Sequence, residues 1–177
     1  MKKRLYIWQL AGFLFTSIAG VLLHFLYDWS GQRVFVALFS AVNESIWEHM
    51  KLVFFPMILF ALIQNKYAKK RYDNFWSVKF ASIITGVILI PVLYYTYIGV
   101  TGRKLDWLNI LIFFIAVATA YITEIRMIKN DQLQGLDSGL CKRLLLLLAL
   151  IFFLFTFRPP QIPIFQDPLT GTYGIFG

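Results

Sequence analysis

The chain has too few charged residues to cover the surface of a soluble domain. Only 15% of its 177 residues are Asp, Glu, Lys or Arg, whereas about 25% is usual in soluble globular domains. Apolar residues make up 59% of the chain, and the mean hydropathy is +0.67. No polar stretch is long enough to fold by itself. These absences exclude a soluble protein and predict a single integral membrane domain over residues 1–177.

Cysteine and histidine are also scarce. The single cysteine, Cys141, excludes an intramolecular disulfide framework. Histidine occurs only twice, as His24 and His49. The net charge is +8, but the basic residues lie between apolar runs and not on one polar face. This pattern argues against nucleic-acid binding and is typical of loops that contact membrane lipids.

Five apolar runs are each long enough to cross a membrane as a helix, for which about 20 residues are needed. They cover about 5–27, 46–65, 75–98, 107–128 and 140–157. The apolar stretch 34–42 is too short to cross and predicts a re-entrant or interfacial segment. The expected fold is therefore an all-α polytopic membrane helix bundle with five transmembrane spans and this short segment. We expect the apolar tail 158–177 to pack on the protein, where it could cover a pocket.

Basic residues are distributed unevenly between the connections. If the N-terminus is cytoplasmic, 12 of the 17 Lys and Arg residues lie on the inner side and five on the outer side. The inner set includes the cluster Lys66, Lys69, Lys70 and Arg71. Because cytoplasmic loops are enriched in Lys and Arg, we expect a multi-pass protein of the cell membrane with a cytoplasmic N-terminus and an extracytoplasmic C-terminus.

The most unusual stretch of the chain begins at the outer side of the second span. It reads Asn43-Glu44-Ser45-Ile46-Trp47-Glu48-His49-Met50-Lys51. Ser45 and Glu48 have the spacing of a capping box, in which each side chain binds the other residue's backbone N–H group. Asn43 and Ser45 are therefore expected to cap a helix. Glu44, Glu48 and His49 would lie at the positive end of that helix.

These residues could meet a second polar group from the first span. His24 and Asp28 lie four residues apart and would share one face of a helix. With the two spans packed together, His24, Asp28, Glu48 and His49 form a ligand set suited to zinc or another divalent metal. Glu44 and Glu48 are then candidates for acid–base catalysis.

Two other interpretations of this cluster are open. Adjacent residues point about 100° apart on a helix, so Glu48 and His49 cannot both face one point without help. The cluster could therefore be a structural one, formed by a helix cap and interfacial anchors, or it could bind a solute or ion for transport. Deeper in the membrane, Lys79 and Glu124 are expected to form an ion pair, with a structural role preferred to a proton relay.

Three strings carry a resemblance to a known family. They are Val42-Asn43-Glu44-Ser45-Ile46-Trp47-Glu48-His49-Met50-Lys51-Leu52, Phe157-Arg158-Pro159-Pro160 and Asp167-Pro168-Leu169-Thr170-Gly171-Thr172-Tyr173-Gly174. With them the chain resembles a family of small bacterial multi-span membrane proteins that is catalogued only as a domain of unknown function. The resemblance covers nearly the whole chain. It implies a fold and a membrane location, and it implies no activity.

Three functions are compatible with the sequence. The first is a metal-dependent hydrolase or transferase that acts on a lipid or envelope substrate. The second is a membrane-embedded solute-binding or transport component with a small-molecule ligand, and the third is a non-catalytic membrane partner or sensor. The distance between the His24 and His49 rings helps to distinguish these functions. Below about 5–6 Å the two rings could share a metal, because Zn–N bonds are about 2.0–2.1 Å long, whereas rings far apart would favour the non-catalytic partner or sensor.

Overall fold

The computed structural model describes residues 2–68 and 74–176, and in this part the protein is helical, with no strand beyond one bridge between Gln166 and Tyr173. The helices are α1 (Lys2–Trp29), α2 (Val34–Ala37), α3 (Ile46–Ala68), α4 (Phe75–Thr101), α5 (Asp106–Lys129) and α6 (Ser138–Phe157), followed by the 3-10 helix η1 (Pro163–Phe165). Five of them, all except α2 and η1, are long and apolar enough to cross a membrane. The predicted all-α class with five spans is confirmed. This architecture is consistent with a multi-pass membrane protein.

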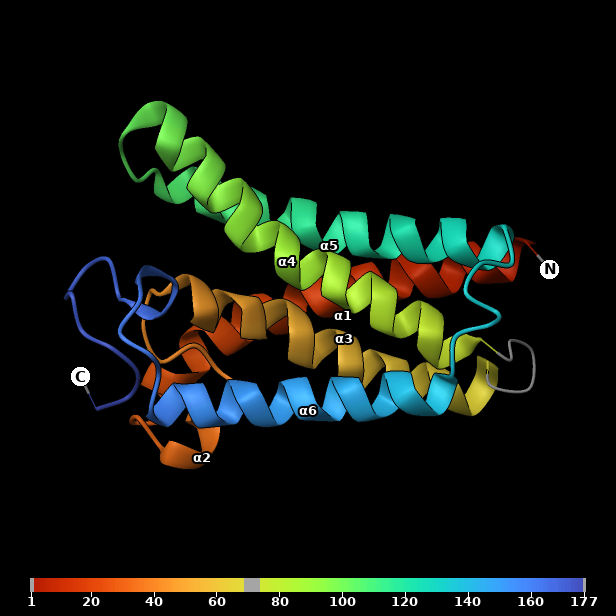
Figure 1. The fold of residues 1–177 in the computed structure, drawn as a ribbon, viewed down its shortest axis with the longest axis horizontal. Coiled ribbons are helices and arrows are strands. Elements are labelled where there is room, and N and C mark those ends of the chain that lie inside the picture. Colours follow the sequence, from red (N-terminus) through yellow and green to blue (C-terminus); the bar gives the residue numbers. More distant parts are fainter. Residues whose placement is uncertain (1, 69–73, 177) are drawn as a thin grey trace.

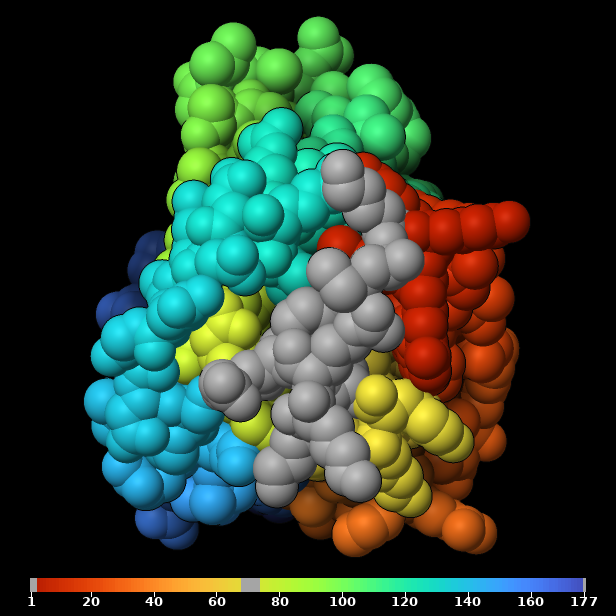
Figure 2. All heavy atoms as spheres, turned by 90° about the vertical axis from the view of Figure 1, so that its right-hand side faces the viewer, coloured from red at the N-terminus to blue at the C-terminus, as the bar shows by residue number. Residues whose placement is uncertain are grey.

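The long helices form one bundle with the chain termini at opposite ends (Figure 1). The end of α1, the start of α3, the α4–α5 connection and the C-terminal tail lie at the end opposite the N-terminus (Figure 1). Figure 2 views the other end, where the start of α1, the end of α3 and the α5–α6 connection lie. The basic residues Lys69, Lys70 and Arg71 fall outside the described residues.

The helices extend beyond the apolar runs by one to three residues at most ends. For α4 the predicted end was 98, but the helix continues to Thr101. It stops there because Gly102 adopts a left-handed conformation, with φ of 68°, and donates its N–H to the Ile98 carbonyl at 2.8 Å. The start of α6 is set by Asp137, whose carboxylate accepts from the Gly139 N–H at 2.7 Å. Capping groups, and not hydropathy, therefore fix these ends.

The short apolar segment 34–42 does not cross the bundle. Only Val34–Ala37 is helical, and this helix lies at the same end as the start of α3 (Figure 1). Phe39 packs against Phe55 of α3 and Phe153 of α6, with ring centroids 5.2 and 5.4 Å apart. The segment is thus held against the bundle end and leads into the start of α3.

Glycines on α1 allow the neighbouring helices to approach closely. A Cβ atom on Gly12 would lie 2.5 Å from the ring of Tyr121 in α5, and one on Gly20 would lie 2.5 Å from the ring of Phe113. Small residues permit this kind of contact between membrane helices. The first span is therefore packed against α5 along much of its length.

A buried ion pair lies in the half of the bundle nearer the N-terminus. Lys79 of α4 and Glu124 of α5 lie 2.7 Å apart, as the sequence predicted, and both are almost completely buried. Gln9 of α1 donates to Glu124 at 2.8 Å. One turn away, Thr16 and Tyr121 share a hydrogen bond of 2.9 Å. These contacts connect α1, α4 and α5 in a region where unpaired polar groups would be costly.

Candidate metal and catalytic site

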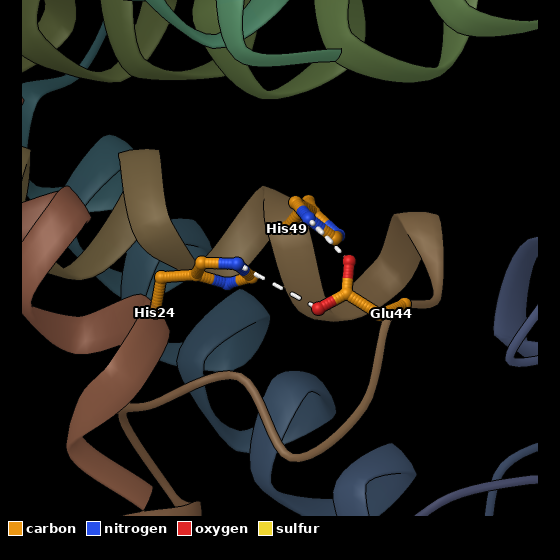
Figure 3. A group of neighbouring side chains, drawn as sticks. All are labelled: His24, Glu44 and His49. Carbon is orange, nitrogen blue, oxygen red and sulfur yellow. Dashed lines mark ion pairs between the residues drawn. The ribbon is translucent and has the colours of Figure 1, made fainter. Parts of the chain in front are cut away.

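Three potential metal ligands converge where α1 ends and α3 begins. The carboxylate of Glu44 lies between the two imidazoles, with Oε1 3.6 Å from His24 Nε2 and Oε2 3.6 Å from His49 Nε2 (Figure 3). The two imidazole centroids are 5.3 Å apart. One ligand atom from each residue lies within 4.8 Å of the others. The His24–His49 distance therefore falls in the range that a shared ion requires.

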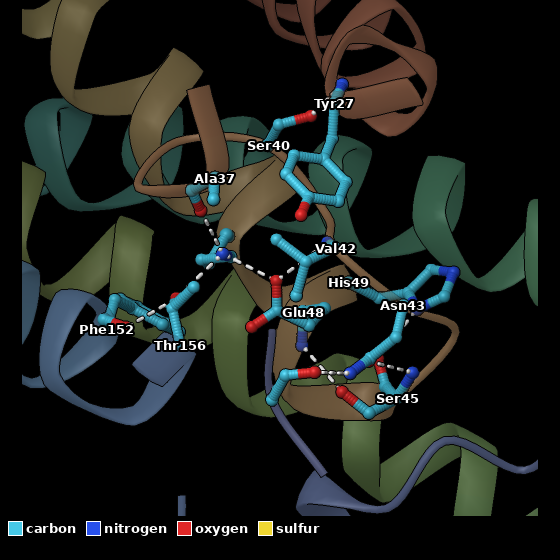
Figure 4. Close-up of polar contacts among 12 residues, drawn as sticks. Tyr27, Ala37, Ser40, Val42, Asn43, Ser45, Glu48, His49, Phe152 and Thr156 are labelled. Carbon is cyan, nitrogen blue, oxygen red and sulfur yellow. Dashed lines mark hydrogen bonds and ion pairs between the residues drawn. The ribbon is translucent and has the colours of Figure 1, made fainter. Parts of the chain in front are cut away.

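The start of α3 positions Glu44 through a local cap. The Ser45 N–H donates to the Asn43 side chain at 3.0 Å, and the Ser45 hydroxyl accepts from the Glu48 N–H at 3.4 Å (Figure 4). Asn43 and Ser45 thus bind backbone groups at the helix start. The second half of the capping box does not form, because the Glu48 carboxylate turns away from Ser45.

Glu48 instead belongs to a buried network beneath the site. Its carboxylate lies 2.5 Å from Lys51 Nζ and accepts from the Val42 N–H at 3.0 Å (Figure 4). Lys51 also donates to the Ala37 carbonyl at 2.9 Å and to the Thr156 hydroxyl at 3.0 Å. Glu48 is 1% exposed and Lys51 is 0% exposed. The network therefore attaches the segment that precedes α3, which contains Glu44, to both α3 and α6.

Two further contacts hold the connection on either side of Glu44. The Ser40 hydroxyl donates to the Leu23 carbonyl and accepts from the Tyr27 N–H at 3.0 Å, so it joins α1 beside His24. The Asn43 side chain donates to the Gly174 carbonyl in the C-terminal tail at 3.2 Å. The connection between α1 and α3 is thus anchored to three other parts of the chain.

The hydrogen bond of His49 fixes which of its ring nitrogens can bind a metal. Its Nδ1 lies 2.8 Å from the Ser45 carbonyl oxygen. A carbonyl oxygen only accepts, so Nδ1 carries the proton and Nε2 of the neutral ring has a free lone pair. That lone pair faces Glu44. A backbone carbonyl in this role commonly orients a metal-binding imidazole.

His49 and Glu44 present hydrogen-bond acceptors to each other. The His49 lone pair and the Glu44 carboxylate are both acceptors, and their 3.6 Å separation is too long for a hydrogen bond. His24 Nδ1 is buried and has no hydrogen-bond partner in residues 2–68 and 74–176. Protonation of both rings would place two like charges about 5.3 Å apart. A single divalent cation would satisfy all three ligands without this repulsion.

The ligand set also matches the chemistry of zinc. Bonds of about 2.0–2.1 Å in tetrahedral geometry place neighbouring ligand atoms about 3.4 Å apart. Each imidazole lies 3.6 Å from its own Glu44 oxygen, and one ligand atom from each residue lies within 4.8 Å of the others. Two histidines and one glutamate are a known catalytic zinc set, which leaves a fourth position for water or substrate. An ion held by these residues would polarise substrate oxygens and acidify water at that position.

The structure changes the ligand set that the sequence favoured. Glu48 is paired with Lys51, because it points about 100° away from His49 on α3. Asp28 is exposed and is not part of the group formed by His24, Glu44 and His49. Glu44, which we expected to act as a base, is the carboxylate that lies between the two imidazoles.

Two cavities adjoin the site. The larger has a volume of about 360 Å³ and lies between α1 and α5, and a hollow of about 20 Å³ lies on the α4 side. Glu44, His49, Asn109 and Phe113 line both. No residue of the described tail lines either one, so the tail supports the loop through Asn43 and does not cover the site.

Sequence analysis missed two polar residues of α5 that line the larger cavity, Asp106 and Asn109. Asn109 accepts from the Tyr97 hydroxyl at 2.6 Å, which ties α5 to α4 beside the site. Asn109 is the only side-chain amide in the fourth span and the only polar residue in its outer half apart from the Asp106 at its start. An isolated amide in a membrane span could have marked Asn109 as a candidate site residue. Its position next to His24 could not have been predicted, because it depends on how α5 packs in the bundle.

Comparison with known proteins places the chain in a family but assigns no activity. The chain belongs to the family of unknown function DUF6512, which matches residues 1–175. No curated protein and no solved structure matches the chain. Its function must therefore be inferred from the chemistry of the site.

Proposed function

We propose that the protein is a metal-dependent hydrolase or transferase of the membrane, in which His24, Glu44 and His49 hold a divalent ion such as zinc. One observation carries this proposal. One nitrogen of His24, one carboxylate oxygen of Glu44 and one nitrogen of His49 lie within 4.8 Å of one another, and the carboxylate lies too far from either ring for a hydrogen bond. A cation bound between these atoms would give each of them a partner.

Each residue around the proposed ion has a different role. His24 and His49 donate neutral nitrogen ligands, Glu44 supplies the negative charge, and Ser45 keeps the His49 ring in the required tautomer. Asp106 borders the cavity next to the site. It is the carboxylate best placed to act as a general base, the role first considered for Glu44 and Glu48.

Zinc binding is the direct test of this proposal. We expect zinc added to metal-free protein to raise its Tm by about 5–10 °C at a free concentration 100 times the Kd, and a chelator to reverse the shift. The matched control is Asp28→Asn, which removes a nearby exposed carboxylate and should give the same shift. A wild-type Tm that does not respond to zinc or to chelator would contradict the proposal.

We further propose that the site faces the outer side of the cell membrane, following the distribution of basic residues. Gln134, between α5 and α6, and Gln161, after α6, are both exposed and provide a matched pair. In a Cys141→Ser background, a membrane-impermeant maleimide should label Gln161→Cys in intact cells. Gln134→Cys should be labelled only after permeabilisation. The reverse labelling pattern would place the site on the cytoplasmic side of the membrane.

A solute transporter is the second candidate, because buried polar side chains continue along α1 beneath the cavity. The Ser17 hydroxyl and Gln9 Oε1 are buried and have no hydrogen-bond partner in the described residues. A transporter for the bound ion would accumulate zinc inside proteoliposomes. A hydrolase or transferase would retain zinc only in proportion to its binding sites.

A further inference from the structure

The larger cavity changes from polar to apolar along its length. Its polar lining consists of His24, Glu44, His49, Asp106 and Asn109. Its apolar lining consists of Gly20, Val21, Phe25, Leu52, Ile110, Phe113 and Phe114. The proposed metal ligands therefore share the cavity with two other polar residues and with a wall of hydrocarbon and aromatic side chains.

The apolar lining reaches deeper into the bundle than the polar lining does. His24 lies near the end of α1, and Gly20 lies about 6 Å deeper at 1.5 Å per residue. Asp106 is the first residue of α5, and Phe113 lies about 10 Å deeper. Polarity thus falls along the cavity in the direction in which it falls from a membrane surface into its hydrocarbon core.

Part of the rim of the cavity is apolar and exposed on the side of the bundle. Val21 is 41% exposed, Phe25 is 44% exposed and Ile110 is 60% exposed. These side chains belong to helices that can span a membrane, so their exposed surfaces would face lipid chains. The opening is therefore suited to a molecule that arrives from within the bilayer.

The deep end of the cavity is narrow. Phe113 packs so closely on α1 that its ring would lie 2.5 Å from a Cβ atom on Gly20. The volume of about 360 Å³ is near the lower end of the roughly 300–1,000 Å³ of ligand pockets. There is room for part of one chain and not for a complete two-chain lipid.

We propose that this cavity takes one hydrocarbon chain of an amphiphile from the surrounding bilayer, whose polar group then lies at His24, Glu44 and His49. The inference rests on the proposed function, since it identifies the substrate class of the same site as a lipid. The chain lies along Val21, Phe113 and Phe114, and the bond next to the headgroup is presented to the ion. A water-soluble substrate would not need the apolar wall.

A photoreactive single-chain lipid tests this assignment. The probe is a lysophosphatidylcholine with a diazirine in the middle of its chain, added to zinc-loaded protein in lipid nanodiscs. We expect its cross-links to concentrate on the cavity wall formed by α1 and α5, at Val21, Phe113 and Phe114. Cross-links spread evenly over the lipid-facing surface would overturn the proposal.

Two tryptophan substitutions on α1 provide the matched comparison. Val21→Trp fills the opening, whereas Ile18→Trp adds the same side chain at an exposed position outside the cavity lining. We expect Val21→Trp to lower cross-linking in the cavity by about tenfold or more, since excluding two chain methylenes suffices for that loss. Ile18→Trp should leave cross-linking unchanged.

Zinc binding measured in the same samples separates the two proposals. Normal zinc binding with lost cavity cross-linking in Val21→Trp supports the lipid assignment. Equal cavity cross-linking in the wild type and in Val21→Trp overturns the lipid assignment. If both proteins still bind zinc in that case, the metal-site proposal stands. Cavity cross-links in a wild-type protein that binds no zinc support the lipid cavity and overturn the metal function.

Discussion

Replacing His49 by alanine should lower the zinc affinity by at least about 100-fold, because loss even of a group that only orients a ligand costs about 10–100-fold. The fold should survive, since the Ser45 carbonyl still accepts from the backbone N–H of residue 49, at 3.2 Å in the native protein. His24→Ala, on a different helix, should cause a comparable loss. Isothermal titration with zinc measures both.

Asp28→Asn is the control for these substitutions. It removes a carboxylate one turn from His24 that lies outside the ligand group, so its zinc affinity should equal that of the wild type. If both histidine variants bound zinc like the wild type, the ion would have to be held elsewhere. Equal loss in Asp28→Asn would instead restore the ligand set that the sequence first favoured.

Replacing Lys51 by methionine should destabilise the protein by about 3–5 kcal/mol, the usual cost of leaving one member of a buried ion pair without its partner. The carboxylate of Glu48 is 1% exposed and would lose its only cationic partner among the described residues. The Ala37 carbonyl and the Thr156 hydroxyl would also lose a donor. Unfolding in mixed micelles measures the change in the free energy of unfolding.

The double variant Glu48→Gln/Lys51→Met identifies the cause. Glutamine can still accept from the Val42 N–H without bringing a buried charge, so the double variant should recover much of the stability lost in Lys51→Met. Additive destabilisation in the double variant would show that packing, and not the unpaired charge, dominates. Because the network holds the segment before Glu44, Lys51→Met should weaken zinc binding as well.

The fold was readily predicted from the sequence because runs of about 20 apolar residues have one stable form in a bilayer. Helix ends were less predictable. The hydropathy of α4 falls near Ile98, but the helix ends at Gly102, where the backbone turns left-handed. The nine-residue segment 34–42 was correctly judged too short to cross, whereas its packing against Phe55 and Phe153 depended on the assembled bundle.

The approach of His24 to His49 could be predicted, since the first two spans are antiparallel and joined by a short connection. Which carboxylate lies beside the two histidines could not be predicted, because that depends on how α3 is rotated about its axis. One signal was overlooked: Glu48 and Lys51 have the i, i+3 spacing at which opposite charges pair on a helix. That pairing removes Glu48 from the site and leaves Glu44 as the carboxylate between the two histidines.

X-ray absorption spectroscopy of the zinc-loaded protein tests the central claim most directly. The account predicts a zinc environment with two imidazole nitrogens and at least one carboxylate oxygen, at bond lengths of about 2.0–2.1 Å. His24→Ala and His49→Ala should each remove one imidazole from that environment. A zinc spectrum with oxygen ligands alone and no imidazole scattering would contradict a metal site at His24, Glu44 and His49.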